Sequence, residues 1–179
     1  PFYYKFSFNE IRNYYIDIVN EVNLPMIIYN FPALSGVTLT SENVREFAQD
    51  LRFIGVKHTS MDLFQLERMK KENGRLIIFN GHDEVFLGGL AMGADGAIGS
   101  TFNFMAEKFI KISRLFSSGK YEDAHELQVE ANQIIDVLIK TGVIQGVKYI
   151  LGKMGIDCGE CRRPFRHLSS EDREKLDKV

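Results

Sequence analysis

The sequence has no tryptophan, only two cysteines and only four prolines in 179 residues. No apolar run approaches the roughly 20 residues that a membrane-spanning helix needs, so no membrane insertion is expected. Lysine and arginine (22) nearly balance aspartate and glutamate (24), which argues against a basic surface for nucleic acid or anionic lipid. With 45% apolar and 26% charged residues, the composition is that of a globular protein, and the length suits one domain.

The two cysteines, Cys158 and Cys161, form a C-x-x-C pair near the C-terminal end. One such pair cannot complete a tetrahedral zinc site. A redox motif should open a helix after a strand, whereas this pair lies in a segment rich in glycine and arginine. We therefore interpret both as ordinary thiols. Because residues 1–6 do not resemble a secretory signal peptide, the low cysteine content predicts a reducing, cytoplasmic location.

Short apolar runs alternate with segments of helical periodicity. The runs predict buried strands at about residues 25–30, 53–56, 76–79 and 94–98. A capping box at Ser7 and Glu10 begins the first helix, Thr40 caps the second, and Gly74 is predicted to end the third as a left-handed cap. Further helices are expected at about residues 84–92, 103–117, 120–141 and 144–154, and a short one after Ser169. This alternation predicts βαβ units and a parallel sheet.

Polar residues fall where each predicted strand ends. They are Tyr29 and Asn30, Lys57 and Thr59, Gly81 to Glu84, and Gly99 with Ser100. Active sites of (β/α)8 barrels and of open α/β sheets lie at this edge. A full barrel takes about 250 residues, so the fold is either a small open sheet or part of a barrel. The start of the sequence, which has no initiator methionine, favours a part.

Lys57 follows the apolar run of the second strand directly. A charged ammonium at the end of a buried strand is costly unless it is paired or neutral. A neutral amine beside a carbonyl substrate forms a Schiff base. A lysine that simply extends to water is the alternative, and taken alone it is the simpler interpretation.

Four motifs in register resemble the superfamily of N-acetylneuraminate lyase and dihydrodipicolinate synthase. They are Tyr-Asn-Phe-Pro at 29–32, Gly-Val-Lys-His-Thr at 55–59, Gly-His-Asp-Glu at 81–84 and Gly-Ala-Ile-Gly-Ser-Thr at 96–101. The resemblance implies a pyruvate-dependent class I aldolase on a (β/α)8 barrel. Residues 1–117 would then form the second half of the barrel, strands five to eight, and residues 118–179 a C-terminal helical extension.

Within that superfamily the sequence resembles the N-acetylneuraminate lyases. Dihydrodipicolinate synthases usually carry an arginine after the Tyr-Asn-x-Pro motif for a second substrate carboxylate, and Leu34 falls there in this sequence. Asp83 and Glu84 offer acceptors for the hydroxyl groups of a polyol instead. The implied reaction cleaves sialic acid to pyruvate and N-acetylmannosamine. Another pyruvate aldolase of the superfamily and a non-catalytic sugar-acid binding module remain as alternatives.

The resemblance also implies the catalytic roles. Lys57 is the expected Schiff-base lysine, which needs no cofactor or metal because the imine itself withdraws electrons. Tyr29 is the expected proton shuttle, although a strand aromatic packed in the barrel mouth is an ordinary alternative. Thr59 lies two residues beyond Lys57, and would contact the substrate or orient the amine.

Four further residues are implied to bind the sugar tail. Gly81 would let the backbone approach it, and Asp83, Glu84 and Ser100 would bond to it. Each has an ordinary alternative: Gly81 as a turn glycine, the two acidic residues as favourable charges at a helix start, and Ser100 as a helix cap.

The remaining expectations concern histidines and partners. His58 alternates away from Lys57 and should face the surrounding helices, and His82 is not expected to be catalytic. By resemblance, Tyr3 or Tyr4 reaches a neighbouring site within a homotetramer. The pyruvyl-carboxylate motif of the family belongs to the first half of the barrel. We therefore expect the site to need an N-terminal half carrying strands one to four, or this sequence to be an incomplete part of a longer chain.

Overall fold

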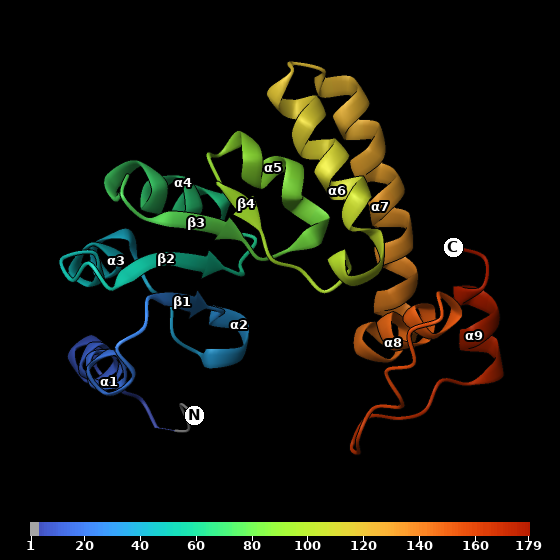
Figure 1. Cartoon of the computed structure of the whole chain (residues 1–179), viewed down its shortest axis with the longest axis horizontal. Helices are drawn as coiled ribbons and strands as arrows, with labels where there is room; N and C mark the ends of the chain where they lie inside the picture. The colour runs from blue at the N-terminus through green and yellow to red at the C-terminus, as the bar shows by residue number, and fades with distance from the viewer. Residues whose placement is uncertain (1–3) are drawn as a thin grey trace. The chain divides into compact units, whose positions relative to one another are not determined.

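The computed structural model describes residues 4–179. Strands and helices alternate along the first hundred residues, and helices follow (Figure 1). The elements are α1 (Phe8–Val22), β1 (Met26–Asn30), α2 (Pro32–Ser35), α3 (Ser41–Phe47), β2 (Phe53–His58), α4 (Leu63–Glu72), β3 (Ile77–Asn80), the 3-10 turn η1 (Asp83–Val85), α5 (Phe86–Ala91), β4 (Gly96–Ala97), α6 (Phe102–Ser117), α7 (Tyr121–Thr141), α8 (Val143–Lys153) and α9 (Ser170–Leu176).

By its internal contacts the chain forms two compact units. The sheet unit runs to His82 and includes Gly88–Ile98. The helical unit comprises Asp83–Leu87 and Gly99–Val179. These units do not test whether the barrel half ends at residue 117, which stays a prediction.

The sheet has four parallel strands in the order β1-β2-β3-β4. Each strand therefore lies beside the next one along the chain, which is the order of consecutive βα units in a barrel. The prediction of a parallel sheet is confirmed. The fourth strand is shorter than expected, because only Gly96 and Ala97 pair with β3.

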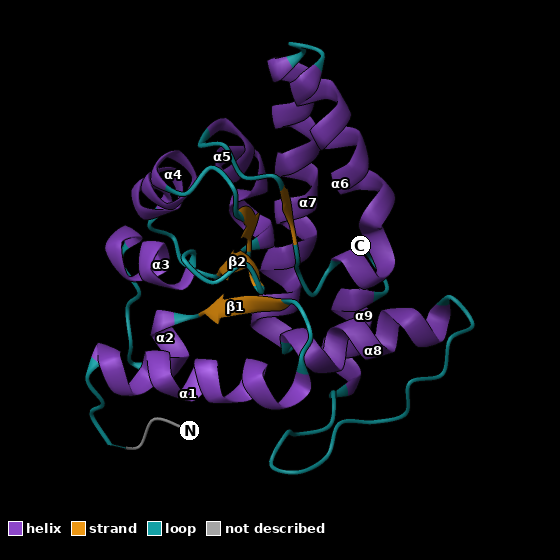
Figure 2. Cartoon of the chain, turned by 60° about the vertical axis from the view of Figure 1, so that its left-hand side comes forward, coloured by secondary structure: helices purple, strands orange, loops and turns teal. Residues whose placement is uncertain are grey.

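Helices cover one face of this sheet. The core joins Ile28, Val56 and Ile78 of the strands, all fully buried, to residues of the three helices α1, α3 and α4: Val19, Val44, Phe47, Leu66 and Met69. Figure 2 shows these purple helices outside the orange strands. The side chains that alternate with this core point the other way. Among them Ile27 and Ile77 are each 39% exposed, so the second face is left open in this unit.

Side-chain caps begin the helices α1 and α3, as predicted. Ser7 and Glu10 form the capping box of α1, and Thr40 caps α3. The predicted left-handed cap at Gly74 is wrong. Asn73 ends α4, and its side-chain amide donates to the carbonyl oxygens of Met69 and Ser41. This tertiary contact with the start of α3 replaces the local glycine cap.

Helix α2 is absent from the helices that the sequence analysis predicts. Pro32 occupies its first turn, where its missing N–H costs nothing. Gly36 closes it with a φ of 69° and donates its N–H to the carbonyl oxygen of Pro32. Both signals, a proline at the helix start and a glycine at its end, are present in the sequence, so this short helix could have been predicted.

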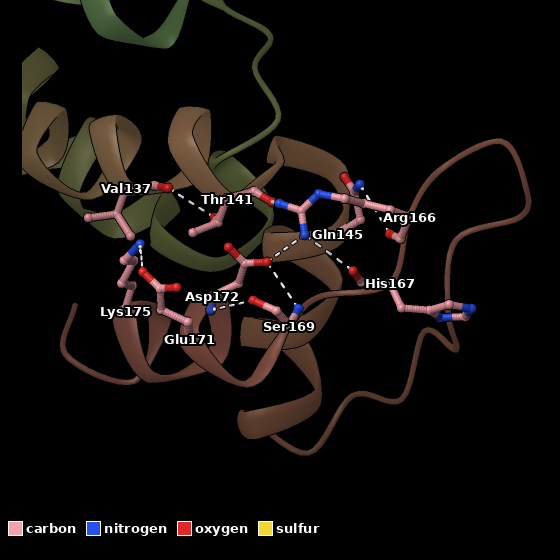
Figure 3. Close-up of polar contacts among 9 residues, drawn as sticks. All are labelled: Val137, Thr141, Gln145, Arg166, His167, Ser169, Glu171, Asp172 and Lys175. Atoms are coloured by element: carbon pink, nitrogen blue, oxygen red, sulfur yellow. Dashed lines mark hydrogen bonds and ion pairs between the residues drawn. The ribbon is translucent and has the colours of Figure 1, made fainter.

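The helical unit packs α6 to α9 around a separate core of Leu138, Val147, Leu151 and Leu176. The predicted cap of α9 is confirmed, with Ser169 as N-cap. Figure 3 shows how Arg166 connects α9 to α7. Its guanidinium donates to the carboxylate of Asp172 at 2.5 Å and to the carbonyl oxygen of Thr141 at 2.9 Å. Within residues 4–179, no helix has both the length and the apolar character to cross a membrane.

Candidate active site

Lys57 and Tyr29 lie side by side at the carboxyl ends of β2 and β1. Their Cα atoms are register partners, so their side chains emerge from the same face of the sheet. The Nζ atom of Lys57 lies 4.2 Å from the centroid of the Tyr29 ring. Lys57 is partly buried, and Tyr29 is 50% exposed. The amine and the phenol predicted to act together are thus brought to one place on the open face of the sheet.

Thr59 and Gly81 form a close contact just past the ends of β2 and β3. Thr59 is buried, and its hydroxyl oxygen has no hydrogen-bond partner in the described part of the chain. A Cβ atom on Gly81 would overlap that hydroxyl oxygen. Backbone bonds hold both residues, from Thr59 N to the oxygen of Asn30 (2.8 Å) and from Gly81 N to the oxygen of His58 (2.9 Å). Glycine at position 81 is therefore required by space.

Asp83 is a buried residue of the helical unit, and its carboxylate is engaged there. Its Oδ2 atom accepts from the backbone N–H of Thr101 at 2.9 Å and from the Thr101 hydroxyl at 2.7 Å. A Cβ atom on Gly99 would overlap the same carboxylate. Asp83 thus holds the start of α6, which is a role that the sequence analysis did not anticipate. Its predicted contact with substrate remains untested.

Glu84 and Ser100 also belong to the helical unit. The backbone oxygen of Glu84 accepts from the side-chain amide of Asn132 at 3.0 Å. Ser100 is exposed, and its backbone oxygen accepts from the Asn103 amide at 2.8 Å. Ser100 is not the cap of α6: the N-cap position is Thr101, whose side chain makes no capping bond.

The structure therefore gathers Tyr29, Lys57, Thr59 and Gly81 in the sheet unit. The other three predicted site residues, Asp83, Glu84 and Ser100, lie in the helical unit.

The remaining predictions concern two histidines, His58 and His82, and the two tyrosines at positions 3 and 4. His58 is 1% exposed and faces the helices, as expected. His82 packs edge-on against the Phe31 ring, with ring centroids 6.1 Å apart. Tyr4 is 71% exposed, whereas Tyr3 lies outside the described residues. That Tyr3 or Tyr4 reaches a neighbouring site stays a prediction.

Metal ligands are not clustered in the described chain. No group of three or more His, Cys, Asp or Glu side chains in residues 4–179 is arranged to hold a metal ion. Cys158 is exposed, Cys161 is partly buried, and both are free thiols.

Comparison with known proteins identifies the family. The model of the dihydrodipicolinate synthetase family matches residues 1–179. The chain belongs to this family. A family member from Rhizobium meliloti named N-acetylneuraminate lyase is 46% identical over 173 residues, which are 96% of this chain and 57% of that protein. The chain therefore spans little more than half the length of such relatives.

Solved structures of the family give the same fold. A Clostridium difficile structure in complex with mannosamine is 38% identical, with a TM-score of 0.96 over 99% of this chain and 61% of its own. A Ruminococcus gnavus sialic acid aldolase, described as a catalytic lysine mutant, is 33% identical, with a TM-score of 0.95 over 99% of this chain and 60% of its own. The chain is thus the α/β second half of a (β/α)8 barrel with helices after it.

Proposed function

We propose that this chain is the lysine-bearing part of an N-acetylneuraminate lyase, which cleaves sialic acid reversibly to pyruvate and N-acetylmannosamine. One observation carries the proposal: the Lys57 amine lies 4.2 Å from the ring of Tyr29 on the neighbouring strand end. In the proposed reaction the amine is the nucleophile that forms the imine, and the phenol is the proton shuttle. The relatives' names supply the substrate class.

In this mechanism Lys57 attacks the C2 ketone of open-chain sialic acid. Loss of water gives an iminium, which draws in the electron pair of the C3–C4 bond as that bond breaks. The C4 hydroxyl gives up its proton through Tyr29 and becomes the aldehyde of N-acetylmannosamine. The enamine left on Lys57 is protonated at C3, and water then hydrolyses the imine and releases pyruvate. The amine is regenerated, so no further cofactor is consumed.

The other predicted residues bind the substrate in this proposal. The buried hydroxyl of Thr59 has no partner among residues 4–179. Because a buried hydroxyl without a partner is costly, this hydroxyl bonds to the substrate or to the Lys57 amine in the proposal. Gly81 keeps that space clear. Asp83, Glu84 and Ser100 bind the hydroxyl groups of the sugar tail in this proposal.

We further propose that catalysis requires strands one to four of the barrel. The open face of the sheet carries Ile27 and Ile77, each 39% exposed, and Tyr29 at 50%. Apolar side chains on a sheet face are normally covered, and the first half of a closed barrel would cover these. A homotetramer of such barrels and a cytoplasmic location are also proposed.

A product assay tests the substrate. The chain is combined with the first barrel half of a relative and offered sialic acid or other 2-keto sugar acids. The proposal expects pyruvate and N-acetylmannosamine from sialic acid, and no product from Lys57→Met. Preferential cleavage of another 2-keto acid would favour a different aldolase of the family. Binding of sialic acid that survives Lys57→Met without any turnover would favour the binding module.

A further inference from the structure

Asn30 and His58 lie directly behind the proposed catalytic pair. Each follows one of its members along the chain, so Asn30 and His58 face the helices where Tyr29 and Lys57 face the open side. The Cα atoms of Asn30 and His58 are register partners, as those of Tyr29 and Lys57 are one residue earlier. Asn30 is 2% exposed and His58 is 1% exposed. Water therefore does not satisfy their polar atoms, which must pair within the protein.

The two side chains bond to each other across the strands. The Nδ2 atom of Asn30 lies 3.0 Å from Nδ1 of His58. The Oδ1 atom of Asn30 accepts from the backbone N–H of Leu39 at 3.5 Å, which orients the amide so that its N–H group faces the histidine. Asn30 is thus the donor of this bond, and Nδ1 of His58 is the acceptor.

The second ring nitrogen fixes the tautomer of His58. Its Nε2 atom lies 3.1 Å from the carbonyl oxygen of Asp62. A carbonyl oxygen only accepts hydrogen bonds, so Nε2 carries the hydrogen and Nδ1 is unprotonated. Burial lowers the pKa of His58, against an opposing effect of the bond to Asp62. The titratable groups whose charges act on the ring are Asp62 and His82. A neutral ring with hydrogen on Nε2 satisfies every contact.

We propose that Asn30 and His58 are positioning residues that set the position of Tyr29 relative to Lys57 for imine formation, in which Tyr29 as proton shuttle also supplies the proton with which the carbinolamine on Lys57 loses water. This inference rests on the proposed function. Backbone bonds alone cannot fix this relative position, because bonds of the same geometry repeat at even intervals along parallel strands. The Asn30–His58 bond is specific to one pair of positions and is buried, where a hydrogen bond is stronger than in water. Adjacent Cα atoms are about 3.8 Å apart, so a shift of this pair is transmitted to the catalytic pair.

Three variants separate positioning from folding. His58→Leu removes both ring nitrogens at similar volume and leaves the Asn30 amide unpaired. His58→Asn is the conservative variant, because its side-chain oxygen can take the place of Nδ1 and accept from Asn30. Asn30→Ala breaks the same bond from the other strand, and it is used if His58→Leu does not unfold cooperatively above the assay temperature.

The readout is the initial rate at which borohydride traps pyruvate on Lys57 in the completed barrel. A misplacement of a reacting group by about 1 Å can lower the reaction rate by about 10²-fold. His58→Leu is therefore expected to slow trapping at saturating pyruvate by about 10- to 100-fold. Because the pyruvate-binding groups are unchanged, the half-saturating pyruvate concentration should move by less than about threefold. His58→Asn should restore the rate to within about threefold of the native rate.

The outcomes distinguish this inference from the proposed function. Native trapping at Lys57, with a folded His58→Leu or Asn30→Ala variant that reacts as fast, overturns the inference alone. A His58→Asn variant that reacts no faster than His58→Leu also overturns it. Absence of an adduct in the native protein overturns the proposed function and this inference with it. A ¹⁵N spectrum showing hydrogen on Nδ1 of His58 overturns the inference whatever the activity.

Discussion

The hydroxyl oxygen of Thr59 occupies the space that a side chain on Gly81 would need. The contact joins the chain segments that follow β2 and β3, next to Lys57. It is confined by backbone bonds on both sides, so neither residue can retreat freely.

Gly81→Ala should therefore disturb both folding and catalysis. Forcing a methyl group into a filled space costs about 1–3 kcal/mol, and the displaced Thr59 hydroxyl should lower turnover of sialic acid. Gly74→Ala is the matched control, because a Cβ atom at Gly74 meets nothing within 4 Å and its φ is not positive. Urea unfolding and turnover are measured on both. Unchanged turnover in Gly81→Ala would contradict the role given to Thr59.

Thr101→Val tests the structural role of Asp83. The change removes the hydroxyl that donates to Asp83 at 2.7 Å but retains the shape of the side chain and the backbone donor. A hydrogen bond to a charged group contributes about 1.5–3 kcal/mol, so unfolding should become easier by about that amount. Thr101→Ser keeps the hydroxyl and is the control. Equal stability of the two variants would show that the bond contributes nothing.

Leu34→Arg tests the basis of substrate choice. Leu34 is 79% exposed, so the change should leave stability within about 0.5 kcal/mol. A charge-assisted hydrogen bond that contributes about 1.5 kcal/mol raises an affinity or a rate by about tenfold. We expect that gain in kcat/KM for an aldehyde acceptor with a second carboxylate, with pyruvate trapping unchanged.

Leu51→Arg is the control for that experiment. Leu51 is similarly exposed, at 75%, but it precedes β2 and so lies at the strand end opposite Lys57. If kcat/KM for the acceptor with a second carboxylate rises equally in both arginine variants, or in neither, position 34 does not govern the choice of substrate.

The ion pair of Asp172 with Arg166 predicts a pH dependence of stability. The bond to Arg166 lowers the pKa of Asp172 in the folded protein, so the unfolded chain takes up this proton first as pH falls. The stabilisation by this ion pair is complete when the pH is well above about 3.9, which is the pKa of an Asp carboxyl in the unfolded chain. It is lost progressively as the pH falls below that value. The Tm gap between the native protein and Asp172→Asn should thus be widest near neutral pH and narrow below pH ~4.

The exposed Asp136–Lys140 pair supplies the matched control for this pH series. Exposed pairs contribute little, so Asp136→Asn should show a small Tm change throughout. A gap for Asp172→Asn that stays constant with pH would contradict the account of this pair.

Local sequence signals predicted the strands, every helix except α2, and three capping residues. These features depend on neighbours in the chain, such as the alternation that correctly turned His58 away from Lys57. Two of the features that were missed involve contacts between distant segments. Asn73 ends α4 through a carbonyl oxygen 32 residues away, and Asp83 binds Thr101 across 18 residues. Neither contact leaves a periodic pattern that a single sequence reveals.

The kink in α6 at Met105 is another feature without a sequence signal. Its φ of −132° is not helical, and neither proline nor glycine marks the position. The chemistry of the site was easier to predict than such conformational details, because the sequence directly gives the type of side chain at each strand end. Its geometry, such as the 4.2 Å between Lys57 and the Tyr29 ring, required the fold.

Borohydride trapping with pyruvate, followed by peptide mapping, tests the central claim most directly. The experiment uses this chain with strands one to four supplied by a relative's first barrel half, after cooperative unfolding has shown that the barrel is folded. The account predicts one reduced pyruvyl adduct, on Lys57, and none in Lys57→Met. A folded barrel that gives no adduct, or gives it on another lysine, would contradict the assignment of Lys57 as the Schiff-base residue.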